Sequence, residues 1–112
     1  MIVEYIRYEI EPSRWQAFEA DYCHAREILL KSPHCLSFDL AQCVEEPSFY
    51  TLRIHWDSQE GHLKGFRNSP DFPAFLARVK PYLTNVREMR HYWPTCSVES
   101  LHANPSVPET PA

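Results

Sequence analysis

Glycine is scarce in this chain of 112 residues, which contains only Gly61 and Gly65. Glycine-rich phosphate loops of the P-loop or dinucleotide-binding kind are therefore excluded, because each needs several glycines at fixed spacing. The chain also lacks an apolar run long enough to span a membrane. Its first ten residues contain acids and no basic leader, so they do not read as a signal peptide. We predict a cytoplasmic protein that has no membrane partner.

Basic runs and paired metal-binding cysteines are missing as well. With 11 Lys and Arg against 15 Asp and Glu, the net charge is −4, and no basic patch predicts binding to nucleic acid. None of the four cysteines forms a C-x-x-C pair. His34 and Cys35 could meet Cys23 or His24 around a metal only by accident of folding, so we expect free thiols, no disulfide and no metal.

Alternating apolar residues predict four strands, at residues 2–10, 35–44, 49–56 and 85–93. In the third strand, Leu52 and Trp56 share the apolar face, whereas His55 lies on the opposite face. His55 and His62 need not converge, because a strand-to-helix corner separates them.

Residues of helical spacing lie between these strands. Residues 11–33 carry a stripe typical of an amphipathic helix, with Ser13 and Gln16 as a predicted capping box. A short helix is expected around Phe66, with Asp57 or Ser58 as its cap, and a further helix over residues 68–83. In the latter, Ser69 is the expected N-cap and Pro70 the first helical residue.

The order strand–helix–strand–strand–helix–strand predicts an α+β fold, the ferredoxin-like βαββαβ arrangement with a four-stranded antiparallel sheet. Helices cover one face of such a sheet, and the other face would expose apolar residues. That face mixes aromatic and charged side chains, which suits a self-complementary interface, so we predict a homodimer through the sheet face. Its residues are Val3, Tyr5, Arg7, Asp39, Phe49, Arg53, Glu88, Arg90 and Tyr92. Residues 1–93 form the predicted domain, and residues 94–112 a proline-rich tail.

Three segments resemble a known family: "SPHCLSFDLAQCVEEPSFYTLRIHWDS", "FRNSPDFPAF" and "MRHY". Together they are similar to the antibiotic biosynthesis monooxygenase (ABM) domain of the dimeric α/β-barrel superfamily. The resemblance covers about residues 1–93 and implies a dimeric α/β barrel. The family includes cofactor-independent oxygenases of polycyclic phenols, haem-degrading enzymes and enzymes that process quorum signals.

The resemblance assigns roles to few residues. Trp56 matches the Trp that the anthrone-type oxygenases place in their pocket, and His62 falls where those enzymes carry a Tyr. Leu52 replaces their Asn, so one polar substrate contact is missing. The positions that serve haem degradation correspond to Ile6, Gly65 and Leu76, give or take one residue, and none of them matches that branch.

Each candidate residue could serve either the packing of the fold or its function. Trp56 is either a core residue or a catalytic one, and His62 is either a surface histidine or the catalytic base. His91 either faces the pocket or is a packed core histidine. Gly61 and Gly65 lie four residues apart, so either a flat aromatic ligand or another backbone approaches that helix face closely, or the helix is loosely formed.

We therefore predict a monooxygenase that uses O2 on an aromatic, phenolic or quinol-like small molecule without a cofactor or metal. Such chemistry needs an apolar slot, a base and donors for an oxyanion. The base would be His62, beside Trp56. The predicted substrate-binding residues are Tyr8, Tyr22, Leu52, Gly65, Phe66, Phe72 and His91. The alternatives are a haem-binding or haem-degrading protein and a non-catalytic dimeric binding or accessory protein.

Overall fold

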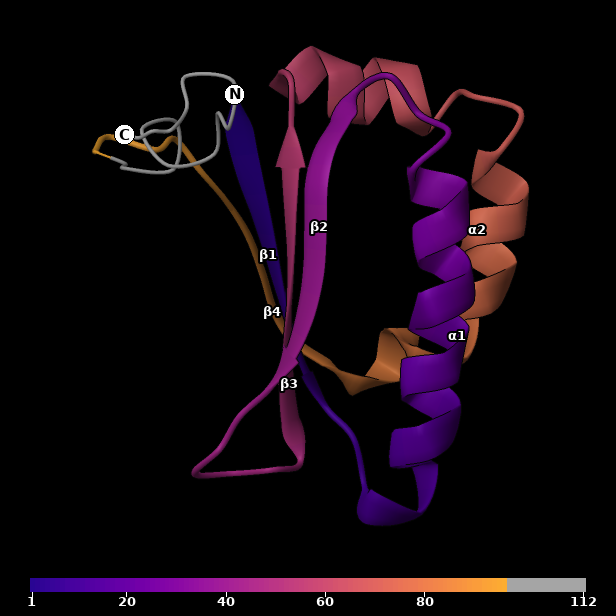
Figure 1. Cartoon of the computed structure of the whole chain (residues 1–112), viewed down its shortest axis with the longest axis vertical. Helices are drawn as coiled ribbons and strands as arrows, with labels where there is room; N and C mark the ends of the chain where they lie inside the picture. Colours follow the sequence, from indigo (N-terminus) through magenta and orange to yellow (C-terminus); the bar gives the residue numbers. More distant parts are fainter. Residues whose placement is uncertain (97–112) are drawn as a thin grey trace, which may run out of the picture.

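The sheet has four antiparallel strands in the spatial order β2-β3-β1-β4. The computed structural model describes residues 1–96, and Figure 1 shows the arrangement of the strands and helices. The strands are β1 (Ile2–Glu9), β2 (Cys35–Gln42), β3 (Phe49–Trp56) and β4 (Val86–Tyr92). This order confirms the predicted ferredoxin-like α+β fold. The first and the last strand in the sequence, β1 and β4, lie side by side in the sheet.

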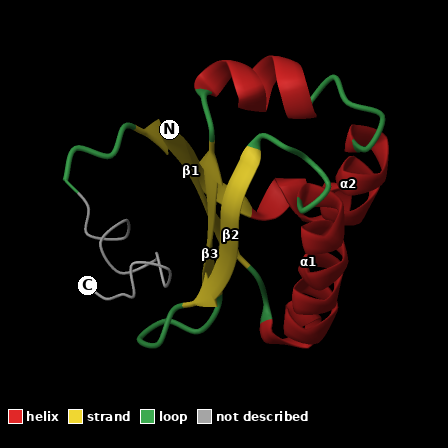
Figure 2. Ribbon diagram, turned by 45° about the horizontal axis from the view of Figure 1, so that its top comes forward, coloured by secondary structure: helices red, strands yellow, loops and turns green. Residues whose placement is uncertain are grey.

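The helices gather on one face of the sheet (Figures 1 and 2). The two longer ones, α1 (Trp15–Leu29) and α2 (Phe72–Val79), pack against each other. A π-helical segment crosses the end of the sheet where β3 finishes, and two 3-10 turns complete the set. These shorter elements are η1 (Pro12–Arg14), η2 (Gly61–Phe66) and η3 (Lys80–Asn85).

Two predicted helix starts were wrong. The capping box of Ser13 and Gln16 does not form, because a 3-10 turn occupies residues 12–14 and no side chain caps α1. Ser69 does not cap α2, which begins at Phe72. Instead, the Ser69 hydroxyl donates to the carbonyl oxygen of Phe66 at 2.7 Å and closes the end of η2. Local hydrogen bonding by serine competes here with the cap that the sequence suggests.

The core lies between the helices and the inward face of the sheet. Phe18 of α1 stands at its centre and makes edge-to-face contacts with Tyr8, Tyr22, Tyr50 and Tyr82. All five rings are at most 3% exposed. Aromatic side chains bury large apolar areas and prefer this edge-to-face geometry, so they dominate the packing of this small domain.

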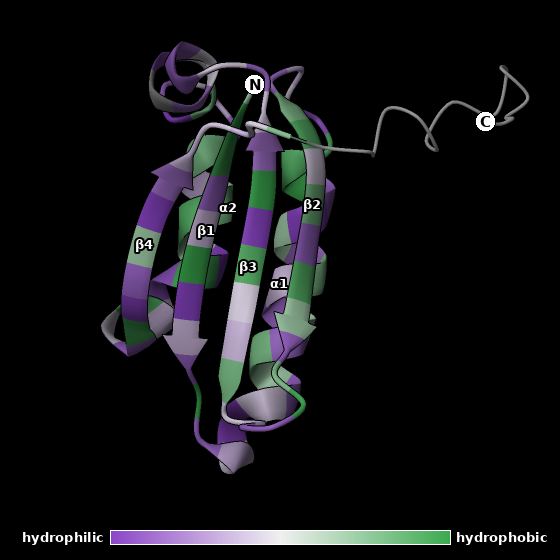
Figure 3. Cartoon of the chain, turned by 90° about the vertical axis from the view of Figure 1, so that its left-hand side faces the viewer, coloured by the Kyte–Doolittle hydropathy of each residue, from purple (hydrophilic) through white to green (hydrophobic). Residues whose placement is uncertain are grey.

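Within residues 1–96, no helix covers the opposite face of the sheet (Figure 3). A cavity of about 760 Å³ lies on it, lined by side chains that include Val3, Tyr5, Arg53 and Tyr92. The rings of Tyr5 and Tyr92 meet edge to face at 5.1 Å, and Arg53 forms an ion pair with Asp39 at 2.7 Å. This mixture of aromatic and charged groups is the surface for which dimerisation was predicted, and the dimer stays a prediction.

Across residues 1–96, no helix combines the length and the apolar character that crossing a bilayer would require. The last strand, β4, ends at Tyr92, and the division of the chain into a domain and a tail at residue 93 stays a prediction. Most of the predicted tail, residues 97–112, lies outside the described residues.

Candidate functional site

A carboxylate is buried on the helix-facing side of the sheet. Glu4 sits in the middle of β1 between apolar neighbours, and only 4% of it is exposed. Its Oε1 accepts a hydrogen bond of 3.0 Å from the indole Nε1–H of Trp56, the last residue of β3. A buried carboxylate is costly unless it is paired, so the indole satisfies part of its hydrogen-bonding capacity. The same hydrogen bond satisfies the indole N–H of the buried Trp56.

The second ring of the site belongs to His62 on η2. It stacks on the Trp56 indole with ring centroids 4.6 Å apart and an interplanar angle of 15°. Its Nε2 lies 3.4 Å from Oε1 of Glu4, and only 4% of the residue is exposed. His62 is therefore a buried residue and not a surface histidine. π-Helical turns are rare and occur frequently at functional sites, which fits the placement of this ring.

His91 of β4 completes the group, because the strand register sets it directly opposite Glu4. Its Nε2 lies 3.2 Å from Nδ1 of His62 and 3.8 Å from Oε2 of Glu4. The His91 side chain is 30% exposed, whereas those of Glu4 and His62 are each 5% exposed. The polar groups thus run from the buried carboxylate through His62 to a ring that reaches solvent.

The surroundings of His62 favour its neutral form. Burial lowers its pKa below the ordinary 6.5, and the neighbouring His91 and Arg67 lower it further, while the Glu4 carboxylate acts in the opposite direction. A neutral imidazole has one nitrogen that can accept a proton. With a carboxylate behind it, such a ring can act as a general base, because the carboxylate stabilises the cation that forms.

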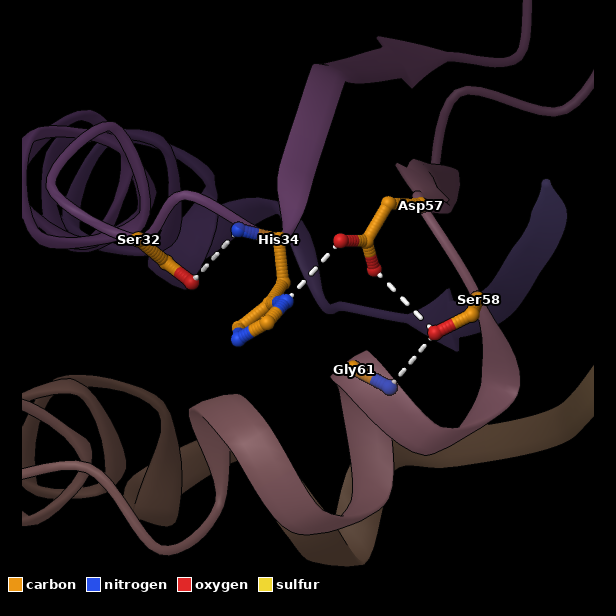
Figure 4. Close-up of polar contacts among 5 residues, drawn as sticks. All are labelled: Ser32, His34, Asp57, Ser58 and Gly61. Carbon is orange, nitrogen blue, oxygen red and sulfur yellow. Dashed lines mark hydrogen bonds and ion pairs between the residues drawn. The ribbon is translucent and has the colours of Figure 1, made fainter.

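The two glycines accommodate a different histidine (Figure 4). A Cβ at Gly65 would lie 2.5 Å from Nε2 of His34, and one at Gly61 would lie 2.9 Å from its Nδ1. The His34 ring is in turn held by Asp57, whose Oδ2 is 2.9 Å from Nδ1. This hydrogen bond is the main reason that the pKa of Asp57 is lowered. The close approach to the glycine face is thus made by the side chains of His34 and Asp57, and not by the ligand or second backbone that the sequence suggested.

The Ser58 hydroxyl accepts a hydrogen bond of 2.8 Å from the backbone N–H of Gly61 (Figure 4). The expected capping role of the Asp57–Ser58 pair at this corner is therefore confirmed for Ser58. Together, the cap and the His34 contact fix the start of η2 against the loop that precedes β2. The position of His62, one residue after Gly61, depends on both contacts.

The other predicted substrate-binding residues lie in the core. Tyr8 and Tyr22 hydrogen-bond to each other through their hydroxyls, and burial raises the pKa of Tyr8 to about 12. Leu52 is fully buried. Phe66 packs on Trp56 with ring centroids 5.5 Å apart and on Phe72 at 5.6 Å. Phe66 and Phe72 form an apolar wall behind the Trp56 ring, whereas the Tyr8–Tyr22 pair lies against Phe18.

The structure therefore brings Trp56, His62, Phe66 and His91 together and adds Glu4, an acid on the otherwise apolar inward face of β1. That placement was the available signal, because a lone acid on a buried face needs a partner. Cavities of about 760 Å³ and 470 Å³ lie elsewhere, on the open face of the sheet and between α1 and β2. The side chains at this site are packed together, and only 4% of His62 is exposed.

The sequence model of the antibiotic biosynthesis monooxygenase family matches residues 1–78. The uncharacterised protein YczJ of Bacillus subtilis is 26% identical over 92 residues, which is 82% of this chain and 97% of YczJ. A solved candidate antibiotic biosynthesis monooxygenase from Bordetella bronchiseptica is 26% identical with a TM-score of 0.73, covering 85% of this chain and 97% of that one. Rv0793 from Mycobacterium tuberculosis is 21% identical, and its structure has the same fold with a TM-score of 0.69. The match covers 86% of this chain and 96% of Rv0793.

Proposed function

Because this chain belongs to the antibiotic biosynthesis monooxygenase family, we propose that it oxidises a phenolic or quinol-like aromatic molecule with O2 and without a bound cofactor. The observation that carries this proposal is the buried imidazole of His62, set between the Glu4 carboxylate and His91 and stacked on Trp56. A general base with a pKa near or below neutrality is what deprotonation of an acidic phenol needs at pH 7.

The proposed reaction needs no outside reductant. His62 accepts the phenolic proton, and the resulting phenolate is electron-rich enough to pass an electron to O2. The phenoxyl radical and the superoxide formed by this transfer combine, which makes a C–O bond to one oxygen atom. Loss of water then leaves a quinone. One phenol and one O2 thus give one quinone and one water, and the four electrons that reduce O2 come from the substrate.

The protein's own groups have separate tasks in this scheme. Glu4 stabilises the imidazolium of His62 once the proton has arrived, and Trp56 supplies a flat apolar surface next to the base. His91, the most exposed of the group, passes the proton between His62 and solvent. The aromatic wall of Phe66 and Phe72 excludes water from the reacting ring.

The test is O2 uptake with anthrone- and hydroquinone-type compounds, followed by mass spectrometry after reaction under ¹⁸O2. Incorporation of one labelled oxygen per product is expected for the wild type. The His62→Ala variant should lose activity by about 10²-fold or more, as removal of a general base does. His24→Ala, on the exposed side of α1, is the matched control and should retain activity. Full activity in His62→Ala would refute the site, and tight ligand binding without O2 uptake would identify a binding protein.

We also infer that the open sheet face binds a second copy of the chain. Its arginines and acids can pair across a twofold axis, and its aromatic pair would be buried there. Sedimentation velocity tests this with Tyr92→Glu, since Tyr92 is 46% exposed and tolerates a charge in the monomer. The variant should sediment as a monomer and the wild type as a dimer. Leu30→Glu, at a residue 66% exposed beyond α1, is the control and should leave the dimer intact.

A further inference from the structure

Three metal-ligating side chains converge at the site from three separate elements. Glu4 comes from β1, His62 from η2 and His91 from β4, and one ligand atom of each lies within 4.8 Å of the others. No two of these residues are close in sequence, so no spacing motif in the sequence indicates that they form a group. Their convergence is a product of the strand register, which sets Glu4 opposite His91, and of the turn that brings η2 over the sheet.

Two of the distances between the donor atoms suit a small cation. In a tetrahedral site with zinc–nitrogen bonds of 2.0–2.1 Å, neighbouring donor atoms lie about 3.3 Å apart. The distance from Nδ1 of His62 to Nε2 of His91 is 3.2 Å. Oε2 of Glu4 lies 3.8 Å from the same nitrogen of His91, so a shift of a few tenths of an ångström would bring it to the ideal separation.

The remaining atoms of the group would orient the ligands. If Nδ1 of His62 binds a cation, its Nε2 keeps a proton and faces Oε1 of Glu4 at 3.4 Å. Stacking on Trp56 holds the plane of the ring, and the indole N–H holds the same carboxylate oxygen. Support of this kind, in which the second nitrogen of a ligating histidine is fixed by a carboxylate, is a regular feature of metal sites.

We propose that Glu4, His62 and His91 form a binding site for a divalent first-row transition cation of the zinc, cobalt, nickel or iron type. Two imidazole nitrogens and one carboxylate select such cations over Mg²⁺ and Ca²⁺, which take mostly oxygen ligands. His91 is 30% exposed and gives the cation its entry from solvent. The inference goes beyond the proposed function, because it concerns binding of an ion and requires no substrate.

The site has a chemical consequence for the proposed base. A cation on Nδ1 of His62 occupies the lone pair that would accept the phenolic proton. Proton transfer to His62 and metal binding therefore exclude each other. Zinc should inhibit oxygenase turnover in proportion to the occupancy of this site.

The test uses tag-free full-length protein without substrate. Co²⁺ is added while the visible d–d absorption is followed, and Zn²⁺ binding is measured by equilibrium dialysis with elemental analysis. One cation per chain is expected, with no competition from excess Mg²⁺. Glu4→Gln and His91→Ala should each weaken binding by about tenfold or more, and His24→Ala should bind as the wild type does.

His91→Ala keeps the test decisive if Glu4→Gln fails to fold, because His91 lies at the partly exposed edge of the sheet. Equal binding by the wild type and His91→Ala would overturn the proposal, as would the absence of saturable binding. The readout involves no O2. A failed metal titration therefore leaves the oxygenase proposal standing, and a failed oxygenase assay leaves the metal site standing.

Discussion

Replacing Gly65 by alanine should reveal how tightly the loop before β2 fits against η2. Alanine is favoured over glycine within a helix by about 1 kcal/mol, so an unobstructed Gly65→Ala substitution would stabilise the protein. Here the added Cβ would lie 2.5 Å from Nε2 of His34, closer than real Cβ contacts come. The His34 ring has to leave and gives up its 2.9 Å hydrogen bond with Asp57.

The magnitude follows from the exposure of that pair. The His34 and Asp57 side chains are 36% and 40% exposed, and solvent-exposed ion pairs contribute about 0–1 kcal/mol. Loss of the pair and of the ring packing offsets the gain in helix propensity, so Gly65→Ala should be neutral or destabilising in the wild type. In a His34→Ala background the obstruction is gone, and the same substitution should stabilise by about 1 kcal/mol.

A double-mutant cycle isolates this effect. Urea unfolding of the wild type, the two single variants and the double variant should give a coupling free energy of about 1–2 kcal/mol, within the range observed for residues in contact. If Gly65→Ala stabilises the wild type and the His34→Ala protein equally, the ring does not occupy the glycine face, and the explanation for the two glycines fails.

Trp56→Phe should keep the stacking on His62 and remove the indole donor to Glu4, with a loss of about 1–3 kcal/mol in unfolding free energy because a buried acceptor loses its partner. The control Trp93→Phe, at a residue 65% exposed, should stay within about 0.5 kcal/mol of the wild type, and similar losses in both would contradict the role of this bond. The lowered pKa of His62 makes a second expectation. Below the ordinary pKa of 6.5, the unfolded chain binds a proton at His62 that the folded chain resists, so stability should fall as pH drops below that value. This one group changes the free energy of unfolding by at most about 1.4 kcal/mol per pH unit. In His62→Leu, the free energy of unfolding should therefore depend less on pH. An unchanged pH profile in that variant would show that other groups cause the loss.

The fold could be predicted from the sequence because the residue patterns that specify its elements are local. The alternation in residues 49–56 and the helical stripe through Phe18 and Tyr22 each specify one element, and the order of the elements specifies the topology. The exact helix starts could not be predicted, since Ser13 lies within a 3-10 turn and the Ser69 hydroxyl donates to the carbonyl oxygen of Phe66 instead of capping α2. A pattern of residue types cannot decide between a cap and a turn that use the same serine.

The site was readable in part. Trp56 and His62 were singled out through the family resemblance and the sequence of the β3–η2 corner. The glycine spacing indicated a close approach but not that side chains make it. The identity of the approaching group, His34, depends on how the loop before β2 packs. Glu4 was visible as an acid on an apolar face, but its partners come from η2, β3 and β4. Contacts over such distances in the chain are decided by register, which composition and periodicity do not give.

The pairing of residue 4 with residue 91 also has a consequence for folding. Closing so long a stretch of chain is entropically costly, and contacts of this kind form late in small domains. The last strand must dock beside the first before His91 can meet Glu4 and His62. Partly folded chains, including one still emerging from the ribosome without β4, therefore have no assembled site. Contact between these side chains thus requires both the first and the last strand of the sheet to be in place.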